Sequence, residues 1–492
     1  MQIIKILFIF GVLTITQNIQ AQIKFFNIYT NNGYDFGEGV CQLSDSSYLI
    51  TGSSSSFGEA PAQAFILHVD SLGNRLWSNA YGGAESDWGR RIFAVEGDGI
   101  YVAGYSNSFG NGLFDFYFFK TDFQGNLLFE KTYGGSKFEK LHGAVMMPDT
   151  TFILVGETSS NETEVEDMYL MRLKSNGDTI WTKTIGSTGK DIAKNVNIVN
   201  DTTFIVVGDY FVTDSLMQKA IVMKMNVNGI IDWTNYTGQN GNYSLNDVTI
   251  NNGIIRAVGS NFVVNSDLTQ FTYIYKYLAN VDGSLIFELL DQSGTDARID
   301  YLTSYGNPTK FYIAEQATNS TIPVFGVGED CFVRRYSEYL FWENFPALNT
   351  SNLGQDQSNQ FIPTSDGGAI LVGYNTSFGS GGKNITLVKI GPNDDYPASY
   401  TAPIEQSLLS VETIENDELL SIFPNPVDEI LHLKSTYSGT IKMSILDLTG
   451  KTVFANSFES DLDVNFENFL TGIYFVHIEI NGNQKVMKVF KK

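Results

Sequence analysis

The chain has 492 residues, enough for two or three domains, or for one large repeat domain and a small one. It carries 54 acidic and 31 basic residues, a formal net charge of −23, which argues against a nucleic-acid partner because phosphate would be repelled. Tyr and Phe are abundant and Pro is scarce, which favours strands over helices.

Residues 1–21 have the pattern of a cleavable secretory signal peptide. Lys5 supplies the positive n-region, Ile6–Ile15 form the apolar h-region, and cleavage is predicted before Gln22. The apolar run is too short for a convincing membrane span, and no later run reaches about 18 residues. We therefore predict an exported protein without a transmembrane span, with an uncleaved N-terminal anchor as the alternative.

The middle of the chain repeats with a period near 52. A glycine that ends a strand recurs at Gly52, Gly104, Gly156 and Gly208, and an aromatic residue recurs in step with it at Trp77, Phe129, Trp181 and Trp233. Each unit is predicted to form four short strands, the last two joined by a polar hairpin turn that contains glycine. Such units are typical of the blades of a β-propeller, and none has the 3.6-residue apolar period of a helical solenoid.

The two ends of the repeat region complement each other. The seventh unit stops at Ile390 without a fourth strand, whereas the segment after Phe25 resembles one and lies 52 residues before Trp77. We predict a seven-bladed β-propeller over residues 22–390 that is closed by the N-terminal strand, which leaves no free edge at the seam. The sixth unit is degenerate, so a count that differs by one, or a stack that never closes, is the alternative.

These units resemble a propeller repeat that is widespread in secreted bacterial and archaeal proteins. The segment DGIYVAGYSNSFGNGLFDFYFFKTDFQGNLLFEKTYGG at 98–135 carries the resemblance well, and the likeness covers about residues 25–390. It implies a propeller and no particular activity.

The pattern changes after the repeats. Residues 391–419 are predicted to be a linker because they hold several prolines and an acidic run. Residues 420–492 are predicted to form a small all-β domain, an immunoglobulin-like β-sandwich, with a strong hairpin signal at 481–483.

This C-terminal part resembles the type A sorting domain of type IX secretion. The segments IFPNP, LDLTGKTV and LTGIYFVHI carry the resemblance through Pro424, Asn425, Pro426, Asp447, Gly450, Lys451, Gly472, Tyr474 and Val476. It implies a Bacteroidota source, the type IX secretion machinery as a partner, and export through the outer membrane to the cell surface or the extracellular space. A sandwich with no sorting role is the alternative.

Catalytic signatures are scarce. The four histidines are far apart in sequence, and neither a His-Glu-x-x-His motif nor a Gly-x-Ser-x-Gly motif occurs. We assign no catalytic residue, no metal ligand and no cofactor from sequence, although calcium at a carboxylate cluster stays open.

Carboxylates recur at one repeat position, ten residues after each fourth-strand aromatic, at Asp35, Asp87, Glu139 and Asp191. In a closed propeller they would lie on one face around part of the axis, where they could bind calcium or a cationic group. The alternative, which we favour, is that they cap turns by accepting hydrogen bonds.

Loops between the second and third strands should emerge on the same face and carry Phe57, Phe109 and Phe378. Exposed rings there would stack on a sugar or a peptide, and rings tucked between blades are the alternative. We therefore predict a non-catalytic surface or secreted module that binds a glycan, a peptide or a protein. A hydrolase or lyase that uses the four carboxylates on a polysaccharide is the second hypothesis, and a structural spacer is the third.

Overall fold

The computed structural model describes residues 24–57, 61–162, 164–213, 217–238, 241–264, 270–291, 297–304, 310–318, 329–340, 348–349, 356–380, 382–392, 404–408, 420–424, 426–435, 437, 439–447, 451–480 and 483–492. The predicted signal peptide, residues 1–21, lies outside these ranges. Within them, no helix is long and apolar enough to cross a membrane.

The described strands up to residue 407 form six four-stranded sheets and one five-stranded sheet. The first three are β2 (Asp35–Gln42), β3 (Tyr48–Ser54), β4 (Gln63–Val69) and β5 (Arg75–Tyr81); β6 (Asp87–Val95), β7 (Gly99–Ser106), β8 (Asp115–Thr121) and β9 (Leu127–Tyr133); and β10 (Glu139–Met146), β11 (Phe152–Thr158), β12 (Asp167–Leu173) and β13 (Thr179–Ile185). The next three are β14 (Ile192–Asn200), β15 (Thr203–Val212), β16 (Met217–Asn226) and β17 (Ile231–Thr237); β18 (Asn242–Asn251), β19 (Ile254–Val264), β20 (Gln270–Asn280) and β21 (Leu285–Asp291); and β22 (Ala297–Ser304), β23 (Lys310–Thr318), β24 (Glu329–Ser337) and β25 (Leu348–Asn349). The five-stranded sheet has the order β26 (Asp356–Pro363), β27 (Ala369–Asn375), β28 (Asn384–Ile390), β1 (Phe25–Thr30) and β29 (Ile404–Ser407).

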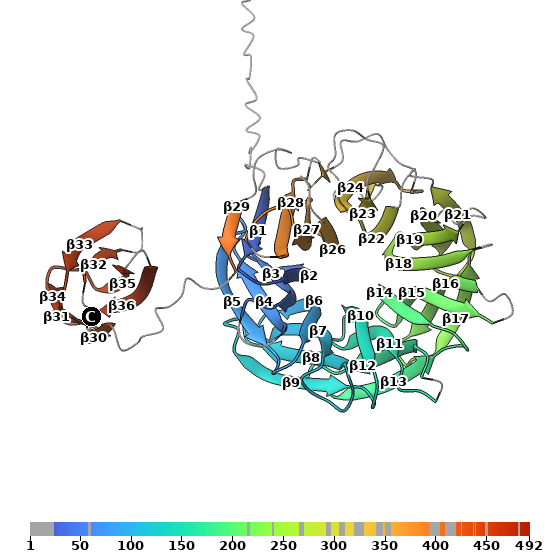
Figure 1. The fold of residues 1–492 in the computed structure, drawn as a ribbon, viewed down its shortest axis with the longest axis horizontal. Helices are drawn as coiled ribbons and strands as arrows, with labels where there is room; N and C mark the ends of the chain where they lie inside the picture. Colours follow the sequence, from blue (N-terminus) through green and yellow to red (C-terminus); the bar gives the residue numbers. More distant parts are fainter. Residues whose placement is uncertain are drawn as a thin grey trace, which may run out of the picture.

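These sheets stand side by side around a common centre, with the first strand of each sheet innermost (Figure 1). This is the arrangement of a β-propeller. Second strands such as β3 and β7 are buried along their whole length, because neighbouring sheets cover both of their faces. The core therefore lies between sheets; Ile50 and Leu67 of the first sheet pack with Ile370 and Leu387 of the last one.

The N-terminal strand β1 belongs to the same sheet as β28. β1 pairs antiparallel with β28, and Phe25 is opposite Lys389. Its Tyr29 hydroxyl donates a hydrogen bond of 2.6 Å to the carbonyl of Gly73 in the next sheet. Tyr81, 52 residues later, bonds to Gly125 in the same way at 2.8 Å, so β1 makes the contacts of a fourth strand.

A short strand from the predicted linker was not anticipated. β29 pairs with β1 in a parallel manner and extends this sheet. The Gln406 side chain donates to the Gly73 carbonyl at 2.8 Å and accepts from the Arg75 backbone N–H at 2.9 Å. Leu408 is fully buried in the core between the last and first sheets. These residues therefore pack as part of the propeller.

Each innermost strand is interrupted at one repeat position by an irregularity of register. In the first three sheets it falls between Gly37 and Gly39, Gly89 and Arg91, and Leu141 and Gly143. β14, β18, β22 and β26 show the same shift. A bulge of this kind re-aims the side chain of the extra residue, here Glu38, Arg90 and His142.

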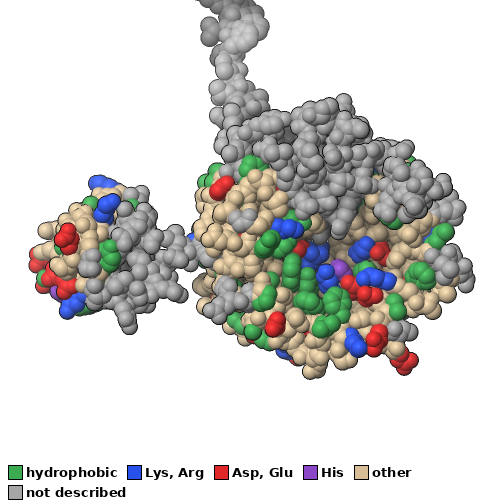
Figure 2. All heavy atoms as spheres, viewed as in Figure 1, with side chains coloured by type: hydrophobic (Ala, Val, Ile, Leu, Met, Phe, Trp, Pro, Cys, Tyr) green, Lys and Arg blue, Asp and Glu red, His purple; other side chains and the backbone are tan. Residues whose placement is uncertain are grey.

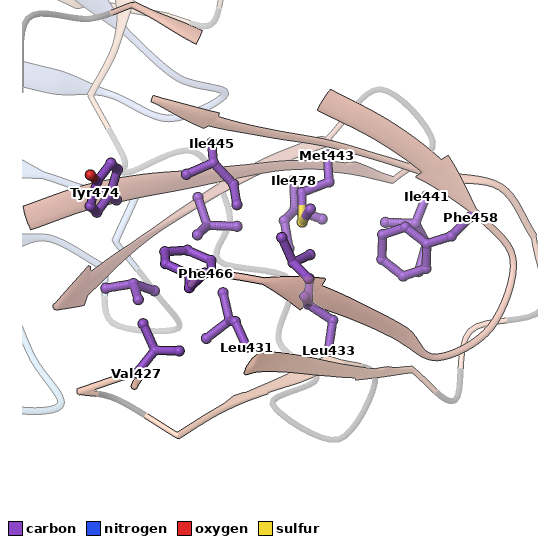
Figure 3. Packing of buried hydrophobic residues seen from close by; sticks show 13 residues of the cluster. Val427, Leu431, Leu433, Ile441, Met443, Ile445, Phe458, Phe466, Tyr474 and Ile478 are labelled. Carbon is purple, nitrogen blue, oxygen red and sulfur yellow. The ribbon is translucent and has the colours of Figure 1, made fainter. Parts of the chain in front are cut away.

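The C-terminal residues form two further sheets that pack face to face. One has the order β30 (Leu420–Phe423), β31 (Ile430–Ser435) and β34 (Leu462–Asn465); the other has the order β33 (Thr452–Phe458), β32 (Ile441–Leu446), β35 (Gly472–Ile480) and β36 (Asn483–Lys491). Apolar side chains that alternate along these strands, among them Leu431, Ile445 and Ile478, meet between the sheets together with Phe466, which directly follows β34 (Figure 3). The domain is thus a small β-sandwich.

Candidate functional site

The repeated carboxylates are buried and hold the connections between sheets. Asp35 accepts hydrogen bonds from the hydroxyls of Ser54 at 2.5 Å and Ser56 at 2.9 Å. Asp87 accepts from Ser106, from Ser108 at 2.7 Å and from the Gly83 backbone N–H at 2.8 Å. The repetition of this bonding shows that the carboxylate fastens the end of the second strand to the start of the inner strand.

The other two members of the series are bonded in a similar way. Glu139 accepts from Thr158 at 2.5 Å and from the Gly135 backbone at 2.7 Å. Asp191 accepts backbone hydrogen bonds from Phe211 at 2.6 Å and Ser187 at 2.5 Å. All four carboxylates are at most 1% exposed, and each of their oxygens is used. In the described ranges, no group of three His, Cys, Asp or Glu side chains is placed to hold a metal ion.

The phenylalanines of the loops are half-buried against neighbouring rings. Phe57 stacks on Phe65, with ring centroids 6.1 Å apart. Phe109 lies 6.0 Å from Tyr117, and Phe378 meets Phe26 edge-on at 6.1 Å. Their rings stabilise the loops, in keeping with the alternative in which they tuck into the propeller.

Other repeat positions bring different side chains together where the inner strands begin. Most are the residue after the repeated carboxylate, its cross-strand partner on the second strand, or the extra residue of the bulge. Two further lysines lie beside them: Lys190 directly precedes Asp191, and Lys383 directly precedes β28. Figure 2 shows hydrophobic side chains beside basic, acidic and histidine side chains near the middle of the ring. We call this group the axial mouth; its members are Phe36, Glu38, Trp88, Arg90, Tyr105, Lys140, His142, Glu157, Lys190, Lys194, Asp209, Tyr374 and Lys383.

One side of the axial mouth is a row of aromatic rings that crosses three sheets. Phe36 meets Tyr374 edge-on at 5.2 Å and lies 5.2 Å from Trp88, which stacks on Tyr105 at 5.8 Å with an interplanar angle of 15°. The Lys383 ammonium is 4.0 Å from the centre of the Tyr374 ring. Phe36 and Trp88 stay partly exposed, so this row offers aromatic surface beside the axis.

The other side of the axial mouth is charged. Glu38 pairs with Arg90 across two sheets. His142 Nε2 lies 3.1 Å from Glu157 Oε1, and the other oxygen of Glu157 lies 3.2 Å from Lys190 Nζ. Lys194 and Asp209 form a further pair at 2.8 Å.

Burial sets the protonation of this charged side. It lowers the pKa of His142 to about 4 against the opposing effect of Glu157, so the imidazole is neutral near pH 7. Burial also lowers the pKa of Lys140, and the nearby Arg90 guanidinium adds to this. The Lys140 ammonium lies 5.4 Å from the centre of the Tyr105 ring. Among the described residues, no carboxylate lies within ion-pair distance of Lys140.

A buried carboxyl pair lies beside this region. Asp115 is 2% exposed and neighbours Glu139. Burial raises the pKa of Asp115 to about 6, and the Glu139 carboxylate adds to the rise. Asp115 accepts a backbone hydrogen bond from Asn111 at 3.0 Å. A β-carbon on Gly134 would overlap both carboxylates, so backbone covers the pair.

A separate cavity of about 290 Å³ is lined by β6, β10, β14, β18 and β26. Its polar side chains bond from one sheet to the next: Asn195 donates to Asp247 at 2.5 Å, and Gln360 accepts from the Val40 backbone at 2.7 Å. These groups hold neighbouring sheets together along the axis. The axial mouth is therefore the stronger candidate for binding a ligand.

In the C-terminal sandwich, part of the predicted sorting motif builds the core. Tyr474 and Val476 are buried, and the Tyr474 hydroxyl donates to the Leu470 carbonyl at 2.9 Å. Gly472 begins β35. The Leu470 side chain is 82% exposed next to this buried cluster.

The rest of the motif lies in turns and on the surface. Asp447 and Lys451 close a turn, since the Asp447 N–H donates to the Lys451 carbonyl at 3.0 Å and its carboxylate accepts from the Lys451 N–H at 3.1 Å. Pro424 and Pro426 are exposed. Two predicted motif residues lie outside the described ranges, Asn425 and Gly450.

Comparison with known proteins identifies the C-terminal part. Residues 421–492 match the family described as "Secretion system C-terminal sorting domain". The chain is thus a β-propeller protein with a C-terminal sorting domain, which indicates export by type IX secretion to the cell surface or the extracellular space. A search of curated protein sequences finds no match.

Solved structures similar to the propeller are distant in sequence. The WD40 domain of Neurospora crassa Pan2 is 10% identical, with a TM-score of 0.43 over 74% of this chain and 91% of that chain. The β-propeller domain of the Trilobed protease from Pyrococcus furiosus is 8% identical, with a TM-score of 0.42 over 77% and 98%. The polysaccharide lyase Uly1 is 10% identical, with a TM-score of 0.43 over 77% and 94%.

Proposed function

We propose that this protein is a non-catalytic binding module of the cell surface or the extracellular space, which takes a glycan, a peptide or a protein at the axial mouth. One observation carries the proposal: aromatic rings and charged side chains meet at the axis, and Phe36, Trp88 and Lys190 among them stay partly exposed. Aromatic faces beside fixed polar groups suit ligand binding because they combine apolar contact with orientation.

In the proposed structure the propeller has seven blades and β1 completes the last one. The pairing of β1 with β28 and the bond from Tyr29 to the next sheet support this closure. A closed ring matters for function because it holds the members of the axial mouth at fixed positions. We further propose a Bacteroidota source and a cleaved signal peptide, for which the sorting domain is the support.

Two measurements test the proposed function. In the producing bacterium, removal of residues 420–492 should abolish the appearance of the propeller outside the outer membrane. The purified full chain should bind at least one member of a panel of glycans and surface proteins without releasing a product. Substitution Trp88→Leu should weaken that binding. Full binding by this variant would show that the ligand binds outside the axial mouth.

The polysaccharide-cleaving alternative has weaker support. A glycosidase needs two carboxyl groups that reach the substrate. The four repeated carboxylates are buried and engaged by hydroxyls and backbone groups. Release of reducing ends from a polysaccharide by the wild-type protein, lost in Asp87→Asn, would favour this alternative.

A further inference from the structure

We propose that the axial mouth binds an anionic polysaccharide, one whose sugar rings carry carboxylate or sulfate groups. The inference rests on the proposed function and adds the chemical class of the ligand. It follows from the division of the axial mouth into an aromatic side and a cationic side.

The aromatic side can hold sugar rings. Phe36 and Trp88 are partly exposed neighbours with ring centroids 5.2 Å apart, and the buried Tyr105 stacks behind Trp88. Sugar rings present C–H groups that pack on aromatic faces, and a row of rings suits a chain of sugars better than a single small molecule. Phe36 and Trp88 belong to neighbouring sheets, so a ligand that packs on both rings would cross from one sheet to the next.

The charges around this row are closer to balance than those of the whole chain. The protein has 54 acidic and 31 basic residues. At the axial mouth, counting Glu166 beside Lys190, five basic side chains meet four carboxylates; they are Arg90, Lys140, Lys190, Lys194 and Lys383, and Glu38, Glu157, Glu166 and Asp209. This near balance in an acidic protein makes the axial mouth a favourable place for an anionic ligand to approach.

Lys140 joins the two sides. Its ammonium lies 5.4 Å from the centre of the Tyr105 ring, and no described carboxylate is within ion-pair distance. The Arg90 guanidinium and the cross-strand Glu157 carboxylate both lie near it and act on its charge in opposite directions. A carboxylate or sulfate on a sugar that stacks on the aromatic row would meet Lys140, so this residue should decide between charged and neutral sugars.

The experiment compares ligands that differ mainly in charge. The purified full chain is titrated calorimetrically with oligogalacturonate, with methyl-esterified oligogalacturonate, and with sulfated carrageenan oligosaccharide. We expect the carboxylated or the sulfated ligand to bind, and the neutral ester to bind at least about 10-fold more weakly, which corresponds to about 1.4 kcal/mol. Binding should weaken with added salt, because salt screens such contacts.

Variants separate charge from packing. Lys140→Gln should weaken binding of the anionic ligand about 10-fold, and Lys140→Arg should retain it. Lys131→Gln is the matched control: its ammonium lies 5.9 Å from the centre of the Phe129 ring on the outer strand β9. This control should bind like the wild type. Thermal unfolding of each variant checks that it is folded.

Three outcomes would overturn the inference. They are equal binding of the charged and neutral ligands, unchanged affinity in Lys140→Gln, and no binding of any of these sugars. If a neutral glycan or a protein binds instead and Trp88→Leu weakens that binding, only the anionic class is wrong. The proposed function then stands.

Discussion

The buried carboxyl pair gives a stability prediction with a definite sign. Burial, together with Glu139, raises the pKa of Asp115 from 3.8 to about 6. The folded protein therefore holds the proton of Asp115 more tightly than the unfolded chain does. This contribution to stability is complete below about pH 4 and is lost as the pH rises through about 6. Since one pKa unit corresponds to about 1.4 kcal/mol, the loss at neutral pH is at most about 3 kcal/mol.

Asn in place of Asp115 keeps the shape of the protonated carboxyl group. Its oxygen can still accept the Asn111 N–H, and its amide can donate to Glu139. Asp115→Asn should therefore be more stable than the wild type at pH 7, by up to about 3 kcal/mol, and nearly equal to it at pH 4. Urea unfolding followed by tryptophan fluorescence between pH 4 and pH 8 measures both values.

A second carboxylate supplies a control of opposite sign. Hydrogen bonds from Lys120 and Tyr101 lower the pKa of Asp98. Asp98→Asn should lose a small amount of stability at pH 7, and the difference should vanish at low pH. Equal stability of Asp115→Asn and wild type at pH 7, or a gap that does not narrow towards pH 4, would show that Asp115 has an ordinary pKa.

Other substitutions test the framework. Leu408→Ala should lower the free energy of unfolding by about 2–5 kcal/mol, because Leu408 is fully buried in the propeller. An unchanged free energy of unfolding in chemical denaturation would show that Leu408 does not pack in the core. Tyr81→Phe should cost about 1 kcal/mol, measured in the same way, because the bond to Gly125 is lost. Gly52→Ala should prevent folding, since its β-carbon would lie 1.7 Å from the Phe36 carbonyl oxygen. Gly97→Ala, with open space around it but a φ of +76°, should cost only about 1 kcal/mol by circular dichroism melting.

Much of the framework could be predicted from sequence because it repeats. Each unit needs the same hairpin, and Asp70 illustrates it: its carboxylate accepts the backbone N–H groups of Leu72 and Asn74, and Gly73 supplies a φ of +80°. The contact of Tyr29 with the next sheet could be inferred because the spacing to Tyr81 is the period itself. Local turn chemistry and a fixed spacing therefore determine most strands.

β29 could not be predicted in this way. It has four residues and no counterpart in other units, and its place depends on the free edge of β1 and on a pocket for Leu408 between two sheets. These are long-range contacts that no local pattern encodes. The local signals of this segment, several prolines and an acidic run, are those of a linker.

Repetition in the sequence points to framework residues and not to the candidate site. Asp35 and Asp87 recur at one repeat position, and their hydrogen bonds hold the connection between sheets. A residue that recurs in every unit has a role that every unit shares, and here that role is to join the second strand to the start of the inner strand. The axial mouth was missed because its members differ from blade to blade.

That difference is itself evidence for binding. The residue after the repeated carboxylate is Phe36, then Trp88, then Lys140, although the surrounding backbone is equivalent in the three sheets. Each sugar of the proposed ligand has an apolar C–H face and an anionic group, so rings on one blade and basic side chains on the next could contact both. In the bound sugar chain that we propose, Trp88 would stack on a sugar ring, and Lys140 at the equivalent position of the next blade would contact its anionic group.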